Sequence, residues 1–209
     1  GNDFDGLAGL VEHRAGKQPE TLKEDDPVLA HVYNLLVGSN RLAARAAVLQ
    51  ARSEGLSAEL LGTALQGEAC QAGRFLAALA KGLAYHEGEV PLPACWVVGG
   101  EATVTLHNVT GKGGRNQEMA LGAVPDLAGV PGVYLVTLAT DGGDGPTDAA
   151  GAVVTGESLQ RAVDAGISPI EALRQNDSYP FFARLDDLLL PGPTRTNVND
   201  LAFVFAFPV

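Results

Sequence analysis

The chain has 209 residues, of which 46% are apolar and 6% aromatic, and its formal net charge is −11 at pH 7. A chain of this length and composition can bury one large core or two small ones, so it is globular. The acidic balance argues against a nucleic-acid surface, because phosphate backbones require clustered Lys and Arg. No apolar run approaches the roughly 20 residues that span a bilayer, and the N-terminus is acidic rather than signal-like, so we expect no membrane partner.

Cysteine and histidine usage excludes two further classes. Cys70 and Cys95 are too few for a disulfide framework and lack metal-ligand spacing, which favours small buried side chains in a reducing, cytoplasmic compartment. The four histidines include no pair at i, i+4, which argues against a zinc site. The chain starts with Gly rather than Met, so a targeting signal on a longer parent would not be visible.

The first half of the chain alternates between strand and helix patterns. Residues 1–27 are a polar lead-in or linker remnant that ends at an Asp-Asp-Pro break, and we expect one ordered domain over 28–209. Apolar runs predict strands, and Ala and Leu at helical spacing, with Gly55 as a stop, predict helices. This alternation favours an α/β sheet with right-handed crossovers. In order, the predicted elements are a strand at 32–37, a turn at 38–40, a helix at 42–54, a strand at 57–61 and a helix at 67–85.

The second half predicts a mixed sheet. Residues 95–98 and 103–106 flank Gly99-Gly100-Glu101 and alternate as a tight hairpin would. The pattern continues with a helix at 116–127, a buried strand at 133–139, a short strand at 152–155, short helices, and a final strand at 201–207 that is apolar on both faces and therefore central or helix-covered. Together these elements predict a mixed β-sheet of about six strands with flanking helices.

Two Gly-rich polar stretches carry the chemistry. In residues 111–118, glycines let the backbone approach a ligand, and the following helix would direct free N–H groups toward an anion. Arg115 could bind phosphoryl or carboxylate oxygens bidentately, and Lys112 could act as a point charge. Residues 102–117 contain both cations and no carboxylate, so a local positive potential survives. The alternatives are an ordinary mobile loop and a Lys112 that is only solvated.

The second stretch, residues 140–148, follows the most strand-like run of the chain, where ligands of α/β sheets collect. Asp141, Asp144 and Asp148 could share a Mg²⁺ or orient a hydroxyl, and the alternative is Asx-turn and N-cap duty. A third cluster contains Asn197, Asn199 and Asp200, which suit either ligand hydroxyls or the bracing of neighbouring loops. Residues 176–178 most simply cap the helix that follows them.

Common nucleotide and hydrolase signatures are absent. No lysine precedes Ser or Thr in a P-loop, residues 111–116 lack the third small residue of a dinucleotide turn, and there is no G-x-S-x-G elbow. Residue chemistry alone therefore predicts an anion-binding α/β domain, with a phosphotransferase as one form of it.

Several polar segments follow one another in a specific order along the chain, at residues 99–101, 111–118, 140–151, 176–179, 192–194 and 197–200, and more loosely at 37–40 and 66–68. In this order they resemble the class II glycerate kinases, the glycerate 2-kinase family whose C-terminal portion is called the MOFRL domain, here about residues 99–209. The resemblance implies the C-terminal domain of a two-domain kinase that phosphorylates D-glycerate with ATP and Mg²⁺ in a cleft between the domains, and it leaves a homo-oligomer open.

The resemblance also implies roles for individual residues. Arg115 matches an arginine regarded as catalytic in the family, and Asp141 and Asp144 are the candidate metal ligands. Some family members carry the name hydroxypyruvate reductase, against which the missing dinucleotide turn speaks. The residues expected to line the cleft are Lys112, Asn116, Glu118, Asp141, Asp144, Thr147, Asp148, Asn197, Asn199 and Asp200.

The chain departs from the family pattern in two ways. The family's N-terminal domain, with its Gly-rich loop and catalytic Lys, has no counterpart here. Arg195 stands where the family usually has Gly, so it strains the turn if φ is positive, or adds a cation if it faces the cleft. We therefore expect either the catalytically incomplete C-terminal part of a glycerate kinase or a stand-alone domain that binds a metabolite or partner. In either case the two Gly-rich loops should converge, with Arg115 facing Asp141 and Asp144 across a space wide enough for a phosphoryl group.

Overall fold

The computed structural model describes residues 22, 26–85 and 90–209, and divides the chain into two compact units, Gly1–Val37 and Gly38–Val209. The described part of the first unit begins with the 3-10 helix η1 (Pro27–His31). The strand predicted at 32–37 is wrong: this segment has no regular secondary structure, and Tyr33 and Leu35 are exposed. A local apolar pattern cannot make a strand unless a neighbouring strand provides hydrogen bonds.

The second unit is built on a six-stranded mixed sheet with the order β1-β2-β6-β3-β4-β5. Strands β1 and β2 are parallel, whereas β6 runs antiparallel to both β2 and β3, and β4 runs antiparallel to β3. The mixed sheet of about six strands is therefore confirmed. The strands are β1 (Ser57–Leu65), β2 (Ala94–Gly100), β3 (Val133–Ala139), β4 (Gly151–Thr155), β5 (Leu188–Leu189) and β6 (Asp200–Ala206).

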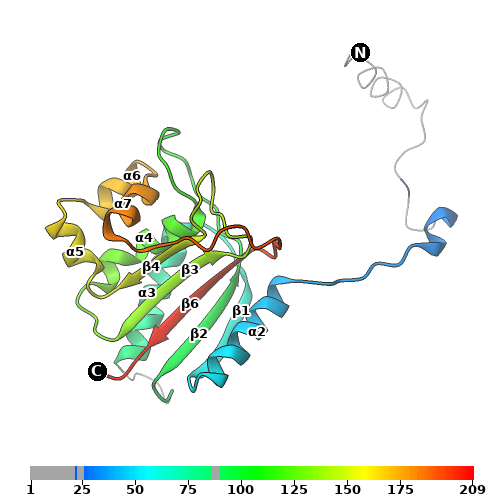
Figure 1. The fold of residues 1–209 in the computed structure, drawn as a ribbon, viewed down its shortest axis with the longest axis horizontal. Helices are drawn as coiled ribbons and strands as arrows, with labels where there is room; N and C mark the ends of the chain where they lie inside the picture. Colours follow the sequence, from blue (N-terminus) through cyan, green and yellow to red (C-terminus); the bar gives the residue numbers. More distant parts are fainter. Residues whose placement is uncertain (1–21, 23–25, 86–89) are drawn as a thin grey trace, which may run out of the picture. The chain divides into compact units, whose positions relative to one another are not determined.

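Helices cover the two faces unequally. Helix α2 packs on β1 and β2, while α3 and α4 pack on the opposite face (Figure 1). The stop predicted for α2 is confirmed, because Gly55 follows its end with φ +86°. The helix begins at Asn40, two residues earlier than predicted, and Ser39 caps its first turn. None of the helices in the described ranges is long and apolar enough to cross a membrane. The helices are α2 (Asn40–Ser53), α3 (Ala69–Ala84), α4 (Arg115–Leu127), α5 (Ser158–Asp164), α6 (Pro169–Arg174) and α7 (Ser178–Leu185).

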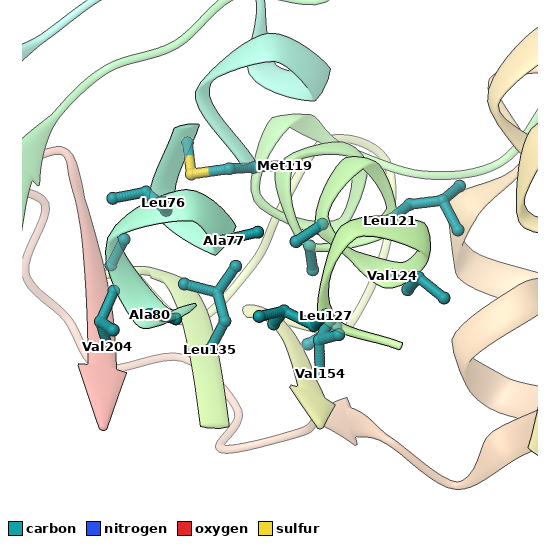
Figure 2. Close-up of a cluster of buried hydrophobic side chains, with 14 of the residues drawn as sticks. Leu76, Ala77, Ala80, Met119, Leu121, Val124, Leu127, Leu135, Val154 and Val204 are labelled. Carbon is teal, nitrogen blue, oxygen red and sulfur yellow. The ribbon is translucent and has the colours of Figure 1, made fainter. Parts of the chain in front are cut away.

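The main core lies between the sheet and the pair α3 and α4. Figure 2 shows Ala80 and Leu127 of these helices near Leu135, Val154 and Val204 of the strands, with Met119 beside Leu76. The two helices approach closely because they meet through glycines: a Cβ added at Gly73 would lie 1.8 Å from a backbone oxygen of α4. This packing holds the N-terminal end of α4 in a defined place above the sheet edge.

The hairpin predicted across Gly99-Gly100 is wrong. Strand β2 pairs with β1 on one edge and β6 on the other, so residues 103–106 have no free edge to pair with and form only an isolated bridge between Thr103 and Glu68. Strand β6 is central, as predicted, and β1 runs to Leu65 rather than ending at residue 61.

The pairing register brings the polar segments to one edge of the sheet. Leu65 lies opposite Gly100, Gly100 opposite Asp200, and Asp200 opposite Ala139. The carboxyl ends of β1, β2 and β3 therefore lie beside the start of β6. The polar segments that follow β2 and β3, and the one that precedes β6, leave or enter the sheet at this edge, which is where α/β sheets bind ligands.

Candidate functional site

A cleft of about 930 Å³ opens at this edge, a volume suited to a small-molecule ligand. Its walls come from the end of β1, from the segment between β2 and α4, and from the loops that precede β4, α7 and β6. Of the residues predicted to line the cleft, Arg115, Glu118 and Asn199 do so.

Arg115 is the anchored cation of this cleft. Its Nε donates to Oδ2 of Asp200 at 2.5 Å and its Nη2 donates to Oδ1 at 3.1 Å, while its Nη1 lies 3.4 Å from Oε1 of Glu101. The hydrogen bond to Asp200 raises the pKa of the guanidinium above its ordinary value. A guanidinium has five N–H donors in a planar fork, so the pair leaves Nη1 and Nη2 donors for a bound anion. Asp200 thus positions Arg115 instead of lining the cleft itself.

Asp144 lies beneath the N-terminus of α4 and not in the cleft. Its carboxylate accepts hydrogen bonds from the backbone N–H groups of Asn116 and Gln117 at 3.1 and 2.9 Å, and from both side-chain amides. It is 1% exposed, and burial raises its pKa against the effect of these bonds. The sequence predicts the anion of a ligand at this helix terminus. In the structure the carboxylate of Asp144 takes that position, which corresponds to the capping alternative.

The two Gly-rich loops converge as predicted, but they touch directly. Gly145 has φ +60°, and a Cβ there would lie 2.4 Å from the carbonyl oxygen of Gly113. A Cβ at Gly114 would lie 2.5 Å from Oδ1 of Asp144. The expectation that Arg115 faces Asp141 and Asp144 across a phosphoryl-sized space is wrong, because these glycines bring loop against loop.

Asp141, Asn197 and Thr147 brace the loops. The carboxylate of Asp141 accepts hydrogen bonds from the Gly143 N–H at 3.2 Å and from Nδ2 of Asn197 at 3.0 Å, and Thr147 donates to the backbone of its own loop. Over the ranges that the structure describes, no three Asp, Glu, His or Cys side chains gather to hold a metal ion. Both oxygens of Asp141 thus accept hydrogen bonds within the loops, and the metal-binding role predicted for Asp141 and Asp144 stays a prediction.

Lys112 lies on a separate, outer surface of its loop. Its Nζ sits 3.8 Å from the ring centroid of Tyr179, whose hydroxyl donates to Oδ1 of Asp148 at 2.7 Å and lowers the pKa of that carboxyl. Neither charged residue lines the cleft. The cation–π contact and the hydrogen bond therefore connect side chains on the outer surface of these loops.

The prediction that Asn176 and Asp177 cap α7 is wrong, because neither side chain bonds the start of that helix. Their side chains instead hold the Gly-rich loop and the segment beside it. Asp177 accepts from the N–H of Lys112 at 2.9 Å. Asn176, in a left-handed conformation with φ +50°, accepts from the backbone N–H groups of His107 and Asn108 at 2.7 and 3.1 Å. Sequence reasoning missed this role, although Asn is a residue type that tolerates φ > 0.

Glu118 is the buried carboxylate of the cleft wall. It is 5% exposed, and burial raises its pKa to about 7, with smaller contributions from Glu68 and Asp144. The Nδ2 of Asn176 donates to its Oε1 at 3.1 Å, which acts in the opposite direction. The cleft therefore combines a fixed guanidinium with a carboxyl group that titrates near neutrality.

Arg195 has φ +62°, so the strained alternative for this position holds. Its side chain does not line the cleft. The left-handed conformation explains why glycine suits this turn.

The model of the MOFRL family matches residues 94–200. A glycerate 2-kinase of Pyrococcus horikoshii is 39% identical over 196 residues, 94% of this chain and 42% of that protein. An Agrobacterium vitis protein with the provisional name hydroxypyruvate reductase is 44% identical over 79% of this chain and 38% of its own length. The crystal structure of a Thermotoga maritima glycerate kinase matches with a TM-score of 0.83 at 37% identity, over 95% of this chain and 49% of that one.

The fold and the cleft define an α/β domain with an anchored arginine at the carboxyl edge of its sheet. The chain belongs to the MOFRL family. It spans about two fifths of the length of the curated relatives it matches, and about half of the Thermotoga chain.

Proposed function

We propose that the chain is the C-terminal part of an ATP-dependent glycerate 2-kinase that phosphorylates D-glycerate and needs an N-terminal half for activity. The observation that carries this proposal is Arg115, held by Asp200 and Glu101 at the wall of the 930 Å³ cleft. Relatives with the names glycerate kinase and glycerate 2-kinase support the reaction, and their greater length supports the need for a second half. Free Cys70 and Cys95 suit the cytoplasm.

Phosphoryl transfer requires the protein to position charges more than to form covalent bonds with the substrate. In phosphoryl transfer, negative charge spreads over the equatorial oxygens, so catalysis depends on positioning and electrostatic stabilisation. Arg115 offers its remaining N–H donors to these oxygens, and the pair with Asp200 keeps the fork oriented before substrate binds. Mg²⁺, when bound, neutralises phosphate charge.

An ADP-release assay tests the proposal on two proteins. One is the chain of residues 1–209, and the other, called the extended chain, places an N-terminal half of the relatives' length before it. We expect D-glycerate-dependent ADP release from the extended chain alone, and no NADH oxidation with hydroxypyruvate from either. Turnover by the 209-residue chain would contradict the need for two halves. An extended chain that binds D-glycerate without ADP release would instead support a metabolite-binding domain.

A further inference from the structure

We propose that Glu118 accepts the proton of the attacking substrate hydroxyl, and that Asn176 is the residue that positions it. This inference rests on the proposed phosphoryl transfer, and it assigns a role within the same cleft that the resemblance left open.

The placement of Glu118 on α4 carries the first step. Glu118 lies three residues after Arg115, so the two side chains leave the same side of the helix about 5–6 Å apart at Cβ. Both line the cleft. An oxygen that attacks a phosphoryl group bound at Arg115 must approach that group within the cleft, which brings its proton within reach of a carboxylate one helical turn away.

The hydrogen bonds of Glu118 carry the second step. Its Oε1 accepts from Nδ2 of Asn176 at 3.1 Å, whereas its Oε2 has no hydrogen-bond partner in the part of the chain that the structure describes. One carboxylate oxygen is therefore held, and the other is available to a hydroxyl. A general base needs this combination of fixed orientation and an open lone pair.

Asn176 can fix the carboxylate because it is itself fixed. It is 4% exposed, and its amide also bonds the backbone of three residues in the neighbouring segment, at Thr105, His107 and Asn108. All of its strong hydrogen-bonding directions are thus satisfied. Asn176 therefore joins the segment after β2, which forms one wall of the cleft, to the carboxylate of Glu118 on α4. This is a positioning role.

The surroundings of Glu118 suit a proton acceptor near neutral pH. Burial is the main cause that raises its pKa to about 7. The charged and titratable groups around it are Glu68 and Cys70 at the start of α3, Asp144 from the loop before β4, Arg115 on its own helix, and His107, whose backbone N–H donates to Asn176. Glu68 and Asp144 both disfavour its ionised form. A base is most effective when its pKa lies near the working pH.

The substrate hydroxyl oxygen forms a bond to the γ-phosphorus of ATP as the bond from that phosphorus to the β,γ-bridging oxygen breaks, and its electron pair leaves with ADP. The hydroxyl proton passes to Oε2 of Glu118, which becomes a neutral carboxylic acid. After product leaves, this proton returns to solvent.

The test compares the pH dependence of kcat in the extended chain for the wild type, Glu118→Gln, Asn176→Asp and the exposed control Glu157→Gln. For wild type and control we expect kcat to fall below about pH 7. Glu118→Gln should lower kcat about 100-fold, abolish that acidic limb, and change KM less than about threefold. Asn176→Asp should move the limb to higher pH, because it places a second carboxylate beside Glu118.

A carboxyl-carbon NMR titration of Glu118 in the 209-residue chain gives a readout that needs no activity. A titration near 7 supports the inference, and one near the ordinary glutamate value overturns it. Retention of the acidic limb by a folded Glu118→Gln enzyme, or a kcat within about threefold of wild type, also overturns it while leaving the kinase proposal intact. An extended wild-type chain without glycerate-dependent ADP release contradicts the kinase proposal, and the assignment of Glu118 falls with it.

Discussion

Replacement of Glu118 by glutamine should change how stability depends on pH. The free energy of unfolding of the variant, relative to that of the wild type, should be greater at alkaline than at acidic pH. Glu118 is 5% exposed, and burial raises its pKa from 4.5 to about 7. The folded state therefore holds the proton more tightly than the unfolded state does. Its stabilising contribution is complete below about pH 4.5 and is lost as the pH rises through 7.

The size of the effect follows from the same two values. Each pKa unit corresponds to about 1.4 kcal/mol, so the full loss is on the order of 3 kcal/mol, of which about 2 kcal/mol falls between pH 5.5 and pH 8. Glutamine keeps an oxygen that can accept from Asn176 but has no titration of its own. The difference in free energy of unfolding between Glu118→Gln and wild type should therefore increase by about 2 kcal/mol over this interval.

Urea unfolding of the 209-residue chain at the two pH values, at constant ionic strength, measures this difference. Glu157→Gln serves as control, because Glu157 is an exposed carboxylate at the start of α5 and should leave the pH dependence as in wild type. If the difference between Glu118→Gln and wild type is the same at both pH values to within about 0.5 kcal/mol, the reasoning from burial is refuted.

Three further predictions concern the anchored arginine, the helix cap and the strained turn. In the extended chain, Arg115→Lys keeps the charge but loses the fork that Asp200 holds, so kcat should fall at least about tenfold, or about 1.4 kcal/mol, in the ADP-release assay; an unchanged kcat would remove Arg115 from the site. Asp144→Ala leaves buried amides at the start of α4 without an acceptor and should lower the free energy of unfolding by about 2–4 kcal/mol in urea, whereas a loss below about 1 kcal/mol would contradict its role as cap. A non-glycine residue at φ +62° costs about 1–2 kcal/mol, and Arg195→Gly removes this strain while adding about 0.5–1 kcal/mol of chain entropy to the unfolded state, so the melting temperature should rise slightly. Arg184→Gly within α7 is the matched control and should lower the melting temperature.

Much of the secondary structure was predictable because its signals are local. The buried strand at 133–139 has the bounds of β3, and the helix predicted at 116–127 begins one residue earlier as α4. A continuous apolar run, or a Gly-rich turn before a helical pattern, carries its own signal within a few residues. The same local reasoning failed at 103–106, because alternation does not reveal whether a neighbouring strand edge is free.

The candidate site was predicted in its segments but not in its contacts. Arg115 and Asp200 were both singled out, yet their pairing spans 85 positions and could not be read from either segment. Asp144 and Asp141 were predicted to bind a metal or a hydroxyl because carboxylates in a Gly-rich loop suit either. In the structure their oxygens accept hydrogen bonds from the start of α4 and from Asn197, respectively. Asn176 was assigned to a cap because a short helix follows it directly.

The sequence by itself determined where most helices and strands lie and which polar segments carry chemistry, because propensity, periodicity and turn residues act over a few neighbouring positions. Only the tertiary structure decided which partner each charge finds. The strand register sets Asp200 beside Gly100 and Ala139, and the close contact of two glycine loops turns Asp144 under α4, leaving Arg115 and Glu118 at the cleft. Such pairings depend on how distant segments pack, since a buried polar group must be satisfied by whatever the fold brings within hydrogen-bonding distance.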